Sequence, residues 1–302
     1  MDFYYGLVQI IGIHALLGLS AYWILLTGQI SLAQAAFFGI GAYLAGMLTT
    51  LWAWPLVPAL FAAAAFSGFI AFLVGFPALR VKGLMLVVAT IAFSEIVRIF
   101  FFNLKYRVVI DGVELGPAGG EGFSQIRYFP LNGWSVFEVM AFIWVFVLSV
   151  MAVLWWLDRS RIGVVLRAVG EDELAAQAAG INVTAIKVLA MTVSGALAGL
   201  GGGIFAHYTT HVEHAQFGIV LAAFALSYPI IGGLSSVFGT VLAAVFIQGF
   251  LVEGLRFMGD WRSFVFGLFI ILIMNLRPDG FFNGRFGWRR FGALQRRKTE
   301  DA

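Results

Sequence analysis

The sequence lacks cysteine altogether, and only 12% of its 302 residues are charged. Without cysteine the protein can form neither disulfides nor thiol-based catalytic sites. It also lacks the patterns GxxxxGK[ST], GxSxG and HExxH, which excludes a Walker-type nucleotide site and hydrolase or zinc sites of those two kinds. We therefore expect a protein that is not an enzyme and that carries no cofactor and no metal.

Hydrophobic residues, in contrast, make up 61% of the chain, and the mean hydropathy is +0.93. Apolar runs long enough to cross about 30 Å of hydrocarbon recur along the whole length. A soluble α/β domain does not contain so many uninterrupted apolar segments. We predict an all-α, polytopic helical membrane protein with about nine transmembrane helices, near residues 3–25, 31–52, 56–76, 84–102, 135–157, 184–206, 217–232, 237–253 and 261–276.

The distribution of Lys and Arg predicts the orientation, because cytoplasmic loops carry the excess of positive charge. With the N-terminus outside and the C-terminus inside, 13 of the 19 Lys and Arg residues fall on the cytoplasmic side. This orientation makes residues 158–187 a cytoplasmic loop and residues 103–134 the long external loop. We predict a transmembrane domain over 1–284 and a basic cytoplasmic tail over 285–302, whose charge suits an anionic lipid surface better than a nucleic acid.

Two predicted spans carry small residues at intervals of three and four. Such stripes let helix backbones approach closely, which helps helices associate in lipid. We therefore expect both spans to lie inside the bundle. The stripes are Ala35, Gly39, Ala42 and Gly46 in the second span, and Gly195, Gly199 and Gly203 in the sixth.

An ion-coupled secondary carrier is one alternative, because ionisable residues inside a membrane are functional candidates by default. Glu95 lies in the fourth span, with Arg98 three residues on, so the two side chains can pair on one helix face. Carriers driven by protons or sodium usually need acids near midspan, and this chain offers at most one. The scarcity argues against this class.

A membrane-embedded metalloenzyme is a second alternative. His207, His211 and His214 would share one face of a continuous helix, with a spacing that could ligate zinc. The segment is expected to leave the helix near His207, however, and it shows no partners that would orient the rings. We expect polar residues at a helix end rather than a metal site.

The cytoplasmic loop contains a short helix signal over 170–179. Three acids, Glu171, Asp172 and Glu173, stand at its start, where the helix dipole favours negative charge, and Gly180 suits its end. Leu174, Ala178 and Ile181 are predicted to form a narrow apolar stripe opposite the acids. A compact helix of this kind is suited to insertion into a groove on another protein.

The segment ELAAQAAG, residues 173–180, resembles the coupling-loop signature of ABC importer permeases, in which EAA is followed after three residues by glycine. The acid of that signature stands one residue early here, at Glu173. The wider stretch 161–183 is similar to branched-chain amino acid permeases of the LivM type. Further matches to that family are GQISLAQAAFFGIGAY at 28–43, TIAFSEIVRI at 90–99, GGLSSVFG at 232–239 and RPDGFF at 277–282.

The resemblance implies the permease subunit of an ATP-driven importer for branched-chain or related amino acids in the bacterial inner membrane. Urea and short-chain amide permeases share much of the pattern and are an alternative. The implied partners are a sister permease of the LivH kind, two cytoplasmic ABC ATPases, a periplasmic substrate-binding protein and membrane lipid, with no nucleic acid.

Such a subunit must contact an ATPase and must form a path for the substrate. For the contact with the ATPase we expect Glu171, Asp172, Glu173, Ala175, Ala176 and Gly180. For the substrate path we expect Gln29, Ser31, Gln34, Thr90, Ser94 and Glu95, with Ser227 beyond them. Interhelical hydrogen bonds are at least as good an explanation for these polar path residues as contact with a solute.

Overall fold

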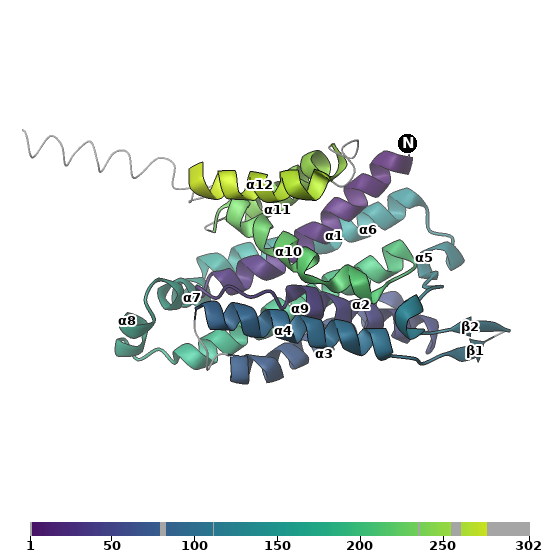
Figure 1. Cartoon of the computed structure of the whole chain (residues 1–302), viewed down its shortest axis with the longest axis horizontal. Helices are drawn as coiled ribbons and strands as arrows, with labels where there is room; N and C mark the ends of the chain where they lie inside the picture. The colour runs from purple at the N-terminus through teal and green to yellow at the C-terminus, as the bar shows by residue number, and fades with distance from the viewer. Residues whose placement is uncertain (1, 79–82, 111, 235, 255–260, 277–302) are drawn as a thin grey trace, which may run out of the picture.

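The computed structural model describes residues 2–78, 83–110, 112–234, 236–254 and 261–276, and it is a bundle of long helices (Figure 1). Its elements are α1 (Asp2–Leu25), α2 (Gln34–Thr50), α3 (Leu56–Ala78), α4 (Leu84–Asn103), β1 (Val108–Ile110), β2 (Val113–Leu115), η1 (Gly119–Glu121), α5 (Tyr128–Leu131), α6 (Val136–Arg159), α7 (Arg161–Glu171), α8 (Glu173–Ala178), α9 (Val183–Thr209), η2 (His214–Phe217), α10 (Ile219–Gly232), α11 (Val237–Phe246), η3 (Ile247–Glu253) and α12 (Trp261–Leu276).

Helix α9 occupies the centre of the bundle and packs against α1, α2 and α3. The packing is close enough that backbone meets backbone. A Cβ atom added at Gly202 would lie 1.8 Å from the carbonyl oxygen of Phe38 in α2, and one added at Gly195 would lie 2.3 Å from the Cβ of Ala71 in α3. The predicted interior position of both small-residue stripes is therefore confirmed, since nearly all of α2 is buried as well.

The outer surface of the bundle is apolar. Helices α3, α4 and α6 expose large hydrophobic side chains, including Phe61, Phe69, Ile96 and Val145. Soluble proteins do not present continuous apolar faces of this kind, whereas lipid-facing helices must. On α6, Phe137 and Trp156 stand about 28 Å apart along the axis, which matches the hydrocarbon thickness. The chain is a polytopic helical membrane protein.

Five described helices are long and apolar enough to cross a bilayer, namely α1, α3, α4, α6 and α9. Two full spans were predicted over 217–232 and 237–253, but here the structure has a broken pair. Helix α10 has 14 residues, about 21 Å of helix, and the chain bends by 120° between it and the segment Val237–Phe250. Pro229 and the left-handed Gly233 (φ 98°) account for the break. The total of nine spans stays a prediction.

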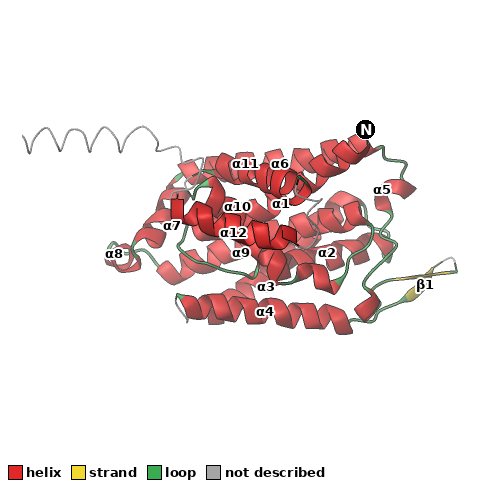
Figure 2. Cartoon of the chain, turned by 45° about the horizontal axis from the view of Figure 1, so that its top comes forward, coloured by secondary structure: helices red, strands yellow, loops and turns green. Residues whose placement is uncertain are grey.

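The bundle has two distinct ends (Figures 1 and 2). The hairpin end carries β1, β2, η1 and α5, close to the N-terminus of α1, and the coupling end carries α7 and α8. The loops predicted to lie on opposite sides of the membrane are thus at opposite ends of the molecule. Within the predicted external loop, β1 and β2 pair antiparallel. Arg107 forms ion pairs with Glu121 and Glu114, and these carboxylates raise the pKa of Arg107. The predicted tail 285–302 and the motif at 277–282 lie outside the described residues.

Because α2 and α9 are in backbone contact at Gly202, adding one methyl group there should lower the stability of the protein strongly. We expect Gly202→Ala to destabilise the purified protein by about 1–3 kcal/mol, because the added carbon collides with backbone and cannot be accommodated by a rotamer change. Thermal unfolding in detergent, followed by tryptophan fluorescence, measures the change.

The matched control is Gly75→Ala. A Cβ atom there has no neighbour closer than 3.7 Å. A Gly202→Ala midpoint equal to that of Gly75→Ala would contradict the packing described here.

Candidate functional site

The chain is not helical between α1 and α2. Helix α1 ends at Leu25, and a turn follows in which the N–H of Gly28 donates to the carbonyl of Leu25 at 3.0 Å. Gly28 adopts a left-handed conformation (φ 71°), and residues 29–32 then run without helical hydrogen bonds until α2 begins at Gln34. Backbone of this kind is tolerated at membrane depth only where protein or water satisfies its polar groups.

Helix α4 supplies those hydrogen bonds. The hydroxyl of Thr90 accepts from the N–H of Leu32 at 3.1 Å, and the hydroxyl of Ser94 donates to the carbonyl of Leu32 at 2.9 Å. The two side chains are four residues apart and therefore share one face of α4. Both side chains are buried, and together they satisfy the two backbone groups of Leu32, which lies outside either helix.

Two glutamines beside this segment have buried polar atoms without a partner among the described residues. Neither the Oε1 nor the Nε2 atom of Gln29 makes a hydrogen bond, and the same holds for Oε1 of Gln34. The Nε2 atom of Gln34 donates to the hydroxyl of Ser194 at 3.2 Å, which in turn donates to the carbonyl of Ser20 at 2.8 Å. Buried amide groups require hydrogen bonds, so these atoms are suited to bind water or a polar solute.

Five of the six predicted path residues thus gather around the non-helical segment 28–33. We call this group the break cluster: Gln29, Ser31, Gln34, Thr90 and Ser94, all at most 6% exposed. It contains no ionisable side chain. Ser227 is buried on α10, where its hydroxyl donates to the carbonyl of Ala223 at 2.6 Å.

Glu95 does not join the break cluster. Its side chain is 49% exposed on the outer face of α4 and forms the predicted pair with Arg98, whose Nε lies 2.9 Å from a carboxylate oxygen. Adjacent residues of a helix point about 100° apart, so Ser94 and Glu95 face different surroundings. Glu95 thus lies apart from the other five predicted path residues, and its place on a path stays a prediction.

At the coupling end the predicted helix over 170–179 is split in two. Helix α7 ends at Glu171, and Asp172 is extended (φ −153°) and caps α8. Its carboxylate accepts from the N–H groups of Leu174 at 2.8 Å and Ala175 at 3.1 Å. This cap is the physical reason for the break. Gly180 is left-handed (φ 83°) and ends the segment as predicted.

Helix α8 is anchored on one side only. Glu173 forms an ion pair with Lys187 of α9, and Lys187 is largely buried. Ala176 packs with Val169 and Val183 in a small apolar cluster that joins α7, α8 and α9. Glu173 and Ala176 therefore hold α8 against the bundle, whereas both were expected to contact a partner.

The opposite side of α8 faces solvent. Leu174 is 75% exposed, and the neighbouring Glu171, Asp172, Ala175 and Gly180 are exposed as well. The predicted stripe is not continuous, because Leu174 and Ala178 are exposed while Ile181 packs inward. The surface available to a partner is the Leu174 side of α8.

The coupling end touches the non-helical segment directly. The last turn of α7 lies against the turn 26–28 with no side chain between them. A Cβ atom added at Gly170 would lie 2.4 Å from the carbonyl oxygen of Leu26 and 3.0 Å from the nitrogen of Gly28. Sequence reasoning missed this contact, although glycine at both positions is the residue type that such an approach requires.

The histidines do not form a metal site. Both ring nitrogens of His207 are occupied, Nε2 by the hydroxyl of Thr49 at 2.8 Å and Nδ1 by the carbonyl of Gly203 at 2.7 Å. Helix α9 ends at Thr209, so His211 and His214 leave its face. Within the ranges that the structure describes, no group of three His, Asp or Glu side chains could hold a metal ion.

Another buried polar network was not predicted. The Tyr228 hydroxyl lies 2.7 Å from Nδ1 of His14 and accepts from Nε2 of Gln248 at 2.7 Å. The network ties α1 to α10 and to the π-helical segment η3. In the sequence, the three are isolated polar residues of separate apolar runs, which does not show that they meet.

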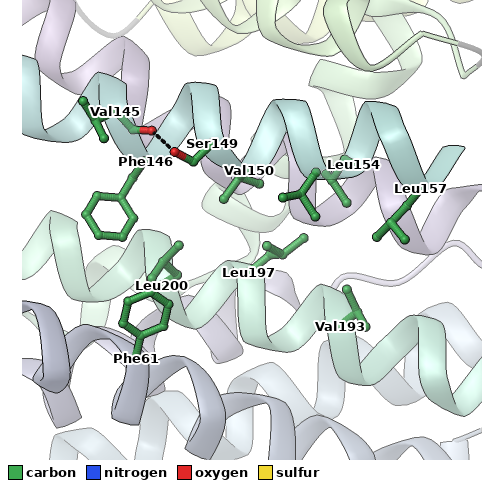
Figure 3. A pocket seen from close by; sticks show the side chains of 11 residues that line it. Phe61, Val145, Phe146, Ser149, Val150, Leu154, Leu157, Val193, Leu197 and Leu200 are labelled. Carbon is green, nitrogen blue, oxygen red and sulfur yellow. Dashed lines mark hydrogen bonds between the residues drawn. The ribbon is translucent and has the colours of Figure 1, made fainter.

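A groove between α3, α6 and α9 is lined almost entirely by apolar side chains, with Phe61 and Phe146 at one end and Leu157 and Val193 at the other (Figure 3). Its one hydroxyl, that of Ser149, donates to the carbonyl of Val145 at 2.6 Å. The groove has no free polar group with which to bind a zwitterion, and it suits hydrocarbon.

Comparison with known proteins agrees with this architecture. Residues 4–274 match the family described as the permease component of branched-chain amino acid transport systems. The LivM permease proteins of high-affinity branched-chain amino acid transport in Salmonella typhimurium and Escherichia coli are 31% and 30% identical to the chain, over 89% of it and 67% of each relative.

A fructose import permease protein of Rhizobium meliloti, FrcC, is 26% identical over 89% of the chain and 76% of its own length. No solved structure matches the chain significantly. The family match covers most of the described helices, including the break cluster and the coupling end. The chain belongs to the family of permease components of branched-chain amino acid transport systems.

Proposed function

We propose that this chain is the permease subunit of an ATP-driven importer of branched-chain or related amino acids, coupled through α8 to a separate ATPase. The observation that carries the proposal is the backbone contact between Gly170 and the turn 26–28. It joins the end of α7, which leads into the exposed helix α8, with the non-helical segment 28–33, where the side-chain amide of Gln29 has no partner among the described residues. A permease that is driven by ATP hydrolysis on another subunit requires a physical connection between the docking surface and the substrate path.

Movement of α8 would reach the bundle by two routes. The Glu173–Lys187 ion pair and the Ala176 contacts connect α8 with α9. The Gly170 contact connects α7 with the segment 28–33. Coupling requires that the two states of the transporter differ in the contacts they make with the partner, and the exposed Leu174 side of α8 is where the partner would make them.

The break cluster fits a small zwitterionic or neutral solute. It offers amide and hydroxyl groups from Gln29, Gln34 and Ser31, and apolar side chains surround it. Binding sites for small molecules commonly combine apolar walls with a few polar groups. Because the cluster holds no ionisable group, it provides no residue for proton coupling, which disfavours the carrier alternative.

The partners we propose are a sister permease, two cytoplasmic ATPases and a substrate-binding protein, assembled in the bacterial inner membrane. Right-side-out vesicles of the host that carry the complex test this function. Uptake of radiolabelled leucine should require ATP inside and binding protein outside, and it should persist in the presence of an ionophore. Full uptake without ATP, or loss of uptake with the ionophore while ATP is present, would contradict the proposal. Adding unlabelled urea, acetamide or fructose in excess tests the solute class, because a true substrate should reduce the uptake of radiolabelled leucine.

Replacing Leu174 should release the ATPase without unfolding the bundle. Leu174 is exposed, so Leu174→Asp removes an apolar contact from the partner interface and leaves the core intact. We expect co-purification of the ATPase with the tagged chain to fall about tenfold, at an unchanged thermal unfolding midpoint.

Leu131→Asp is the matched control, because Leu131 is 81% exposed at the hairpin end. Equal ATPase recovery with Leu174→Asp and Leu131→Asp would show that the Leu174 side of α8 is not the interface.

Removing the hydroxyls that hold Leu32 should impair transport. In Thr90→Val and Ser94→Ala one buried backbone group loses its partner, at about 1–3 kcal/mol each. We expect the double variant to lower the initial rate of leucine uptake about tenfold or more, while the ATPase still co-purifies. Ser149→Ala, which removes a hydroxyl bonded only within α6, should leave uptake unchanged. Wild-type uptake by the double variant would contradict this role.

A further inference from the structure

A second polar cavity lies at the hairpin end, well away from the break cluster. It has a volume of about 470 Å³ and opens between the end of α2, strand β2 and residues 125–132. The break cluster surrounds the start of α2, and the 17 residues of α2 place about 24 Å between its ends. The two sites are therefore separate.

Arg127 is the single charged residue that lines the cavity. Its guanidinium group has no ion-pair or hydrogen-bond partner among the described residues. Two acids of this end, Glu114 and Glu121, pair with Arg107 instead. Val113 and Leu115 of β2 face the cavity, so alternation along the strand turns Glu114 away from it. Among the residues that line the cavity, Arg127 therefore brings the one formal charge.

The remaining lining is amphipathic. Thr50, Gln125 and Asn132 bring neutral polar groups. The Nδ2 atom of Asn132 donates to the carbonyl of Tyr128 at 2.8 Å, which leaves its Oδ1 atom as an acceptor. Trp54, together with Leu131 and the two β2 side chains, supplies apolar wall. A cation beside an apolar wall suits a small carboxylate with an apolar side chain.

Backbone strain is concentrated around the same cavity. Ala53 (φ 50°), Gln125 (φ 69°) and Thr210 (φ 59°) are the non-glycine residues with positive φ in the described part of the chain. Ala53 and Gln125 line the cavity, and the carbonyl of Thr210 accepts from the N–H of Ile126 at 3.1 Å. Non-glycine residues in this conformation tend to cluster where a structure binds or gates a ligand.

We propose that this cavity binds the solute before it enters the path, with Arg127 pairing with the carboxylate and the Trp54 side of the cavity receiving the apolar side chain. The proposal rests on the proposed function in one respect: the hairpin end must face the side from which solute arrives. The chemical class of the ligand follows from the cavity itself, namely a monocarboxylate with a short aliphatic side chain.

Ligand-observed NMR on the chain in lipid nanodiscs tests the proposal without any ATPase or transport. Leucine should give a saturation-transfer signal with the wild-type chain, and leucinamide, which has no carboxylate, should not. Arg127→Met should weaken leucine binding about tenfold, because it removes a charge-assisted hydrogen bond. Arg127→Lys should retain part of the signal. Arg127 is exposed, so its replacement removes no core contact, and an unchanged thermal unfolding midpoint shows that the variant is folded.

Lys105→Met is the matched control, because Lys105 is an exposed cation of the same end that does not line the cavity. It should leave leucine binding unchanged. Equal signals from wild type and Arg127→Met, or equal binding of leucine and leucinamide, would overturn the proposal.

If Arg127→Met lowered the affinity of the chain for the substrate-binding protein and left leucine binding unchanged, the proposal would also be overturned. Arg127 would then belong to a docking surface for that protein. Failure of the proposed transport function would appear in the vesicle assay alone, so the two failures are distinguishable.

Discussion

The structure depends on one constraint, which is that a peptide unit without helical hydrogen bonds must find partners inside an apolar bundle. The segment 28–33 meets this constraint through Thr90 and Ser94, whose hydroxyls hold the N–H and the carbonyl of Leu32. Helix α4 is thereby fixed to the start of α2, although its outer face is turned to lipid. Beside it, both side-chain amide atoms of Gln29 and the Oε1 atom of Gln34 have no partner among the described residues, and in the proposed function they would meet the solute. The non-helical segment 28–33 thus brings polar groups into the apolar bundle and is also a segment that can change conformation.

In the proposed function, the break is also where the coupling end would act on the interior. A continuous helix would resist bending, whereas an extended segment held by two side-chain hydrogen bonds can shift at a modest energetic cost. Gly170 abuts the first turn of this segment, and Glu173 and Ala176 tie α8 to α9. A push on the exposed side of α8 would therefore reach the break and the central helix together. The cavity around Arg127 lies at the other end of α2, where solute would first meet the protein.

Much of this could be predicted from the sequence, because lipid-facing helices are long apolar runs with small residues where they touch. The spans α1, α3, α4, α6 and α9 and both small-residue stripes were predicted on that basis. The break at 28–33 could not be, since the hydroxyls that stabilise it are 58 and 62 residues away from Leu32. Polarity selected Thr90 and Ser94, which contact Leu32, and also Glu95, which does not, because the sequence does not show which face of α4 is turned inward. The split at Asp172 likewise depends on a local cap that composition does not reveal, whereas Pro229 and the two glycines that follow it do indicate a bend.

The connection between the coupling end and the break is the central claim, and Gly170→Ala tests it most directly. In the complex reconstituted into vesicles, the number of solute molecules imported per ATP hydrolysed is compared among wild type, Gly170→Ala and Gly75→Ala. We predict that Gly170→Ala hydrolyses ATP but imports about tenfold less leucine per ATP, because the methyl group forces α7 away from the turn 26–28. Gly75→Ala should match wild type. An unchanged import ratio in a Gly170→Ala complex that retains its ATPase and its thermal stability would contradict the claim.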